Sequence, residues 1–183
     1  MSTYSTARLR QVLIVAALAL LPLCSSSAFA ADAQAAFARL GQLAGDWEGQ
    51  FANGRHHTVN YRFSAGGTVL VETWALAPGR ESITVYYVDG DELLATHYCP
   101  QGTQPRLRLV DDAGGRLSFE LRDGGNLALA GKSHQQAFWL ELSGENGYRR
   151  SETYVENGGA AQSGQADAPV QYRRIAAGDA PRI

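Results

Sequence analysis

The chain has 183 residues, enough for one domain of ordinary size with a buried core. A hydrophobic content of 45% and a charged content of 19% are those of a globular protein, which excludes a fibrous or wholly disordered chain. The formal charge is −2 and the basic residues form no stripe, which argues against a nucleic acid or an anionic membrane surface as partner.

The first thirty residues have the pattern of a signal peptide. Arg8 and Arg10 give a charged start, Val12–Leu23 forms an apolar run, and Ala28-Phe29-Ala30 fits a cleavage motif. The apolar run is too short to span a membrane. We therefore expect cleavage after Ala30, a periplasmic or secreted location, and no transmembrane segment in the mature chain.

The leader contains one of the two cysteines, Cys24. Bulky Leu23 stands just before it, where a lipid-attachment motif needs a small residue, so a lipid anchor is disfavoured. Cleavage after Ala30 leaves Cys99 alone, and a lone cysteine cannot form an internal disulfide. Stability must then come from apolar packing, with Cys99 either a small buried residue or a reactive thiol.

A short helix is expected after the leader. Asp32 can cap it, Phe37 and Leu40 belong to an apolar stripe at helical spacing, and Gly45 supplies the stop. A helix with one such stripe is suited to closing one end of a barrel.

From Asp46 onward the apolar residues alternate with a period of two, which is typical of β-strands. Turn signals such as Asn53-Gly54 and Asp89-Gly90 separate the runs at spacings of roughly 8 to 12 residues. The runs expected as strands are Trp47–Phe51, Thr58–Phe63, Thr68–Leu76, Ser82–Val88, Glu92–Cys99, Arg106–Val110, Leu117–Leu121, Leu127–Ala130, Phe138–Leu142, Tyr148–Val155 and Val170–Ile175.

The connections are too short for a crossover helix, so neighbouring strands must be antiparallel. A meander exposes two edges unless its first and last strands pair. We therefore predict an all-β fold, an antiparallel up-and-down β-barrel of about ten strands with a short N-terminal helix, in preference to a two-sheet sandwich. The barrel is expected over residues 31–176, with a mobile loop at Asn157–Ala168 and a disordered tail at 177–183.

Several segments resemble an uncharacterised bacterial family of lipocalin-like proteins, which are calycin-type barrels. The matching segments are Leu43–Gly49, with the Gly-x-Trp entry of lipocalin-like barrels, Gly66–Thr73, Thr96–Cys99 and Gly102–Arg106. The resemblance covers most of the mature chain and implies a lipocalin-like fold, but it brings no established activity. The chain departs from the family pattern at Thr103, where Asn is usual, and at Gln135, where Met is usual.

No cofactor or metal is expected. Haem-binding barrels of related architecture use a late histidine as iron ligand, and no histidine follows His134. His56 and His57 would point to opposite faces of a strand, so the pair cannot chelate an ion by itself. Fatty-acid carriers place two helices between their first two strands. In this chain Asn53-Gly54 joins the first two expected strands directly, which disfavours that subgroup.

His97 is the leading candidate for a functional side chain. Strand alternation places it on one face with Ala95 and Cys99. If that face is the interior, the imidazole must find a hydrogen-bond partner. A hydrogen-bonded core histidine and a histidine that contacts a ligand both stay open. The candidate partners are Glu72, Tyr87 and Arg106.

Arg106 and Arg108 lie two residues apart and share a face. They either line the barrel, with Glu72 or Glu120 as counter-ion, or point to solvent. An inward arginine can hold a ligand carboxylate by charge-assisted hydrogen bonds. The predicted ligand-binding residues are Glu72, Tyr87, His97, Arg106 and Arg108, and no catalytic residue is assigned.

Three functions stay open. The first is a binding protein that takes a small hydrophobic or amphipathic molecule into the barrel, and the second is a structural or interaction protein whose barrel is filled by its own side chains. The third is an acid-base enzyme that uses Glu72 and His97, although no familiar catalytic motif is present. A cavity of roughly 300 Å³ or more would favour the first. The sequence does not indicate the oligomeric state.

Overall fold

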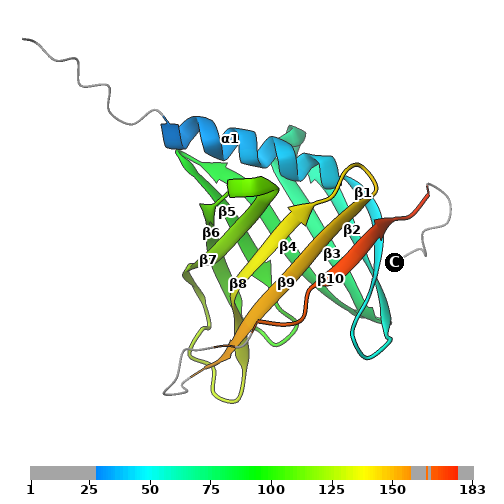
Figure 1. Ribbon diagram of the computed structural model, residues 1–183. Coiled ribbons are helices and arrows are strands. Elements are labelled where there is room, and N and C mark those ends of the chain that lie inside the picture. The colour runs from blue at the N-terminus through cyan, green and yellow to red at the C-terminus, as the bar shows by residue number, and fades with distance from the viewer. Residues whose placement is uncertain (1–27, 158–163, 165, 177–183) are drawn as a thin grey trace, which may run out of the picture.

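A computed structural model describes residues 28–157, 164 and 166–176. Its main elements are one α-helix and ten β-strands, with three short 3-10 helices (Figure 1). The elements are α1 (Ala28–Leu40), β1 (Gly45–Gln50), β2 (His56–Ser64), β3 (Val69–Ala77), β4 (Arg80–Asp89), β5 (Glu92–Tyr98), β6 (Gln104–Asp111), β7 (Arg116–Gly125), β8 (Ser133–Leu142), β9 (Gly147–Glu156) and β10 (Val170–Arg174), and the 3-10 helices are Gly41–Leu43, Ala65–Gly67 and Ala113–Gly115.

The strands form a closed antiparallel barrel in which each strand pairs with the next along the chain. The barrel closes where β1 pairs with β10, in the register Trp47↔Arg174 and Gly49↔Tyr172. The predicted up-and-down barrel is therefore confirmed. Closure satisfies the backbone of both outer strands, which an open meander would leave exposed.

One predicted strand is wrong. Leu127–Ala130 forms turns between β7 and β8, and the Leu129 amide donates to the Asn126 carbonyl. Asn126 has a positive φ of 59°, which breaks the extended chain just before the expected strand. Two apolar leucines with small neighbours imitate a strand pattern there, although the segment pairs with neither adjoining strand.

The helix differs from its prediction at the start. It begins at Ala28, so Asp32 lies inside α1 instead of capping it. It ends at Leu40 and passes into the 3-10 turn Gly41–Leu43. The predicted leader lies mostly in residues 1–27, and the predicted tail at 177–183 and most of the predicted loop at 157–168 also lie outside the described residues.

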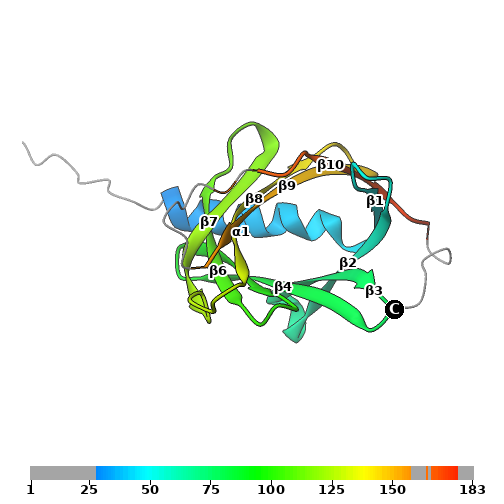
Figure 2. The ribbon, with the colours of Figure 1, turned by 90° about the horizontal axis from the view of Figure 1, so that it is seen from below.

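Helix α1 closes one end of the barrel. In the view from below, it lies across the far end of the ring of strands (Figure 2). Ala33, Ala36 and Leu40 are buried on its inner side. The half of the barrel beneath it is filled by large side chains, namely Trp47, Tyr61, Phe119, Phe138 and Tyr148.

The corner where α1 leads into β1 is held by one arginine from the last strand. Arg174 donates to the carbonyls of Gln42, Ala44 and Glu145 at 2.7 to 2.9 Å, and its guanidinium lies 4.2 Å from the centre of a Trp47 ring. Gly45 has a φ of 128°, and a Cβ there would lie 2.7 Å from Nη1 of Arg174. The Gly-x-Trp segment thus depends on a partner at the other end of the chain.

Replacing Arg174 with alanine should destabilise the barrel by about 2 kcal/mol, because three carbonyls lose a charged donor and the Trp47 ring loses its cover. Arg173→Ala is the matched control. Its side chain is 74% exposed and pairs only with Glu48, so its removal should cost less than about 0.5 kcal/mol. Urea unfolding followed by circular dichroism measures both, and equal losses would contradict this account of the corner.

Candidate ligand-binding site

Glu72 and His97 both point into the barrel, as the interior alternative predicts. They lie on β3 and β5, and Thr84 of β4 stands between them in the register Glu72↔Thr84 and Thr84↔His97. All three side chains are buried. The alternation of strand side chains, together with this register, brings residues from three strands into one row.

The carboxylate of Glu72 accepts hydrogen bonds from three donors. Tyr86 donates its hydroxyl at 2.5 Å, Nη1 of Arg150 donates at 2.8 Å, and the indole nitrogen of Trp74 is the third donor. Glu72 is fully buried, so these bonds replace the water that the charged group loses. A carboxylate held by so many donors is a structural anchor and not a free base.

Arg150 is the functional residue that sequence reasoning missed. It lies on β9 with its side chain 1% exposed, and besides Glu72 it binds the carboxylate of Glu152 through Nε at 2.7 Å. Its guanidinium lies 4.5 Å from the centre of the Phe138 ring and 5.1 Å from that of Trp74. Nη2 of Arg150 is buried and has no hydrogen-bond partner among the described residues.

Burial and charge act in opposite directions on this cluster. Burial alone would lower the pKa of Arg150, but the carboxylates of Glu72 and Glu152 outweigh it and hold that pKa above its usual range. Burial raises the pKa of Glu152, against the opposing effect of Arg150. One guanidinium is thus shared between the buried carboxyl group of Glu72 and the partly buried one of Glu152.

Two of the three buried histidines, His97 and His57, are uncharged at neutral pH. Burial lowers the pKa of His97 to about 4, and Nδ1 of its ring lies 3.0 Å from the Thr84 hydroxyl. Burial likewise lowers the pKa of His57 to about 4, with Arg55 adding to the effect. The His57 ring lies between the rings of Phe51 and Trp74, at centroid distances of 4.0 and 5.0 Å.

Tyr87, Arg106 and Arg108 lie on the outer face of the barrel, so they cannot contact a molecule held inside. Strand alternation turns Tyr86 inward and Tyr87 outward on β4. Arg106 forms two hydrogen bonds to Asp123, at 2.6 and 2.7 Å, and Arg108 pairs with Glu92 at 3.8 Å. Of the two alternatives left open for these arginines, the outward one holds, and counter-ions on neighbouring strands pair with them there.

A cavity of about 310 Å³ lies at the end of the barrel opposite α1. It occurs where β1 and β10 diverge beyond the pair Gly49↔Tyr172. Aromatic side chains and the Arg150 cluster face it together. The lining residues that matter here are Phe51, Trp74, Arg150, Glu152, Asp167 and Tyr172. His97 is not part of this lining, so the cavity lies beyond the row that contains Glu72.

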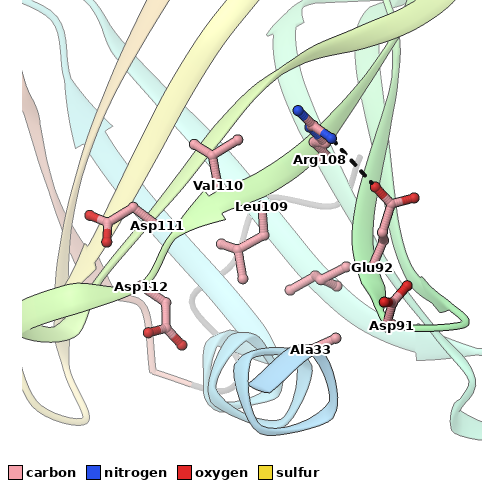
Figure 3. Close-up of a pocket in the computed structure, with 9 residues that line it drawn as sticks. Ala33, Asp91, Glu92, Arg108, Leu109, Val110, Asp111 and Asp112 are labelled. Carbon is pink, nitrogen blue, oxygen red and sulfur yellow. Dashed lines mark ion pairs between the residues drawn. The ribbon is translucent and has the colours of Figure 1, made fainter. Parts of the chain in front are cut away.

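A second cavity, of about 560 Å³, lies beside α1 (Figure 3). It occupies the seam where β5 and β6 stop pairing beyond Leu94↔Arg108. Figure 3 shows Glu92 and Arg108 paired across the seam, with Ala33 of α1 below. The lining is acidic and aliphatic and has no aromatic residue, and no buried polar atom of these lining residues lacks a partner. The aromatic cavity is therefore the stronger site.

Other chemistry finds less support in the described residues. No hydrogen bond there joins Glu72 to His97, although the enzyme hypothesis needs them in contact. Within the same part of the chain, no three or more His, Cys, Asp or Glu residues gather in a way that could hold a metal ion.

No helix among the described residues is long and apolar enough to cross a membrane. Cys99 is a half-buried free thiol.

Comparison with solved structures shows a likeness in fold to proteins that include one of unknown function. A protein of unknown function from the DUF3598 family of Nostoc punctiforme has 15% sequence identity to this chain and a TM-score of 0.49. The match covers 74% of this chain and 49% of that one, so this chain spans about half the length of that protein. No protein-family model matches the chain, and no curated protein matches it.

Replacing Arg150 with methionine should destabilise the protein by about 3 to 5 kcal/mol, because the buried carboxylate of Glu72 and the partly buried carboxylate of Glu152 are left without a counter-ion. Arg106→Ala breaks an ion pair on the outer face and should cost less than about 1 kcal/mol. The double variant Glu72→Met/Arg150→Met should recover part of the loss. Urea unfolding tests all three, and an Arg150→Met loss no larger than that of Arg106→Ala would refute the role of the cluster.

Stability should fall as the pH drops from 6.5 to 4. In this window the unfolded chain binds protons at His57 and His97 that the folded chain does not, so unfolding becomes easier by about 3 kcal/mol for the deeply buried His97 and by less for His57, which solvent screens more. Glu152 acts in the opposite sense, since its raised pKa makes the folded chain bind the proton more strongly.

The His97→Gln variant isolates one of these contributions. The slope of unfolding free energy against pH should become shallower in His97→Gln, while the exposed-site control His56→Gln keeps the wild-type slope. Urea unfolding at several pH values gives these slopes. An unchanged slope in His97→Gln would show that its ring is not held neutral by burial.

Proposed function

We propose that this protein is an exported binding protein, lipocalin-like in kind, which takes a small, largely apolar molecule into the open end of its barrel. The observation that carries the proposal is the cavity of about 310 Å³ lined by Phe51, Trp74 and Tyr172 with Arg150 beside them. Sites for small molecules are typically concave, roughly 300 to 1,000 Å³ in volume, mostly apolar, and supplied with a few convergent polar groups.

The division of the interior supports a site at that end. The half near α1 is packed with aromatic side chains, among them Trp47, Tyr61 and Tyr148. A structural protein with a filled barrel would show such packing along its whole length. Here only the half near α1 is packed in this way. The cavity begins where the packing gives way to buried polar groups, so a ligand would enter only part of the barrel.

The export part of the proposal rests on the N-terminal pattern of a charged start, an apolar run and Ala28-Phe29-Ala30. The lipocalin-like part rests on the resemblance of the Gly45-x-Trp47 segment, and the closed barrel is consistent with it. An acid-base enzyme that uses Glu72 and His97 receives less support, because three donors already occupy the Glu72 carboxylate.

The mature protein isolated from its own cell envelope should carry a small molecule, which native mass spectrometry would detect as added mass that is lost on denaturation. Ala168→Trp, which places a large ring at the cavity rim, should abolish the added mass. Ala113→Trp, at an exposed turn beside the closed end, is the matched control and should keep it. If neither the isolated protein nor the apo-protein offered a panel of small apolar compounds gains mass, the proposal fails.

A further inference from the structure

Arg150, one of the residues that line the aromatic cavity, has a buried hydrogen-bond donor that is unused among the described residues. Arg150 donates through Nη1 to Glu72 and through Nε to Glu152, while its Nη2 has no partner among the described residues. A buried donor without a partner costs about 1 to 3 kcal/mol, so such groups in native proteins call for a specific explanation. Arg150 lines the cavity, which makes a ligand atom the natural acceptor.

The positive charge beside this donor is already balanced by carboxyl groups, which outnumber it. The positive charge of Arg150 is shared by the carboxyl groups of Glu72 and Glu152, and Asp167 lies at the cavity rim. His57 and His97 add no positive charge at neutral pH. Arg55 lies over the Phe51 ring at 4.9 Å but is exposed, so water screens its charge.

We propose that the cavity binds an uncharged molecule with a flat apolar body, which places a hydrogen-bond acceptor such as a carbonyl oxygen against Nη2 of Arg150. This inference rests on the proposed function and names the chemical class of its ligand. An anion would add a third negative group to a desolvated cluster with one guanidinium. A cation would leave Nη2 unpaired and approach a guanidinium that already lies beside Trp74.

The body of the ligand is defined by the aromatic walls. Trp74 and Tyr172 both line the cavity, with ring centroids 6.0 Å apart and planes at 67°. His57 stacks on one face of Trp74 and Tyr148 on one face of Tyr172, so a flat ring would pack against the parts of these two rings that their neighbours leave free. The acceptor on the ring then decides which of several flat molecules binds.

Three probes of nearly equal size test the proposal, namely benzamide, benzoate and benzylamine. They carry a neutral acceptor, an anion and a cation on the same ring. Dissociation constants come from shifts of the Trp74 indole N–H signal in NMR titrations of the full mature protein at pH 7.5. Benzamide should bind at least tenfold more tightly than either of the other two, and Ala168→Trp should remove its binding.

Variants of the cluster give a second, independent readout. Glu152→Gln keeps an acceptor for Nε but removes one negative charge, so benzoate should bind several-fold more tightly than to wild type while benzamide is unchanged. Glu145→Gln removes the same charge at an exposed turn and should change neither. Arg150→Lys keeps the charge but lacks Nη2, and it should weaken benzamide at least tenfold.

Each outcome decides a different question. Benzoate or benzylamine binding as tightly as benzamide would overturn the inference about ligand class and leave the proposed binding function standing. A Glu152→Gln variant with no gain for benzoate would likewise overturn the charge argument. No shift with any of the three probes at millimolar concentration would count against the binding function itself.

Discussion

The buried ion pair between Glu72 and Arg150 is the interaction on which the interior depends. It joins β3 to β9, which are separated in the barrel by β2, β1 and β10, so it spans the inside and not a neighbouring edge. Both side chains are 1% exposed. Taking two charges out of water is costly, and the further hydrogen bonds that Trp74 and Tyr86 donate to Glu72 and that Arg150 donates to Glu152 make the pair tolerable.

The fold was largely predictable because its main signal is local. A period of two along the chain, with short turns between runs, requires antiparallel neighbours and favours closure. The same period predicts which residues share a face, and it placed Glu72 and His97 correctly once one face was taken as the interior. It failed at Leu127–Ala130, where leucines occur without a partner strand. Composition gives the possibility of a strand, whereas pairing decides whether it forms.

The site was predictable only in part, because its members come from strands far apart in the sequence. Strand alternation shows that Arg106 and Arg108 share a face but not whether that face is inside or outside the barrel. On the outside they pair with Asp123 and Glu92 of neighbouring strands, and no local sequence pattern reveals the register that brings these residues together. Arg150 follows Arg149 on a strand of mixed polarity, so either could have been the inward residue. Its place two residues after Tyr148, on the same face as that aromatic side chain, was the available signal.

Among the described residues, most buried side-chain atoms without a hydrogen-bond partner lie in the open half of the barrel, although Nε of Arg39 on α1 is one as well. His57, Gln135 and Arg150 each have a buried side-chain nitrogen or oxygen without a partner among the described residues. All three lie on strand segments far from α1, whereas the tightly packed aromatic residues lie beneath the helix. Since each such atom costs stability, the closed half supplies the packing that holds the barrel together. The open half can then tolerate the polar groups that it leaves without partners.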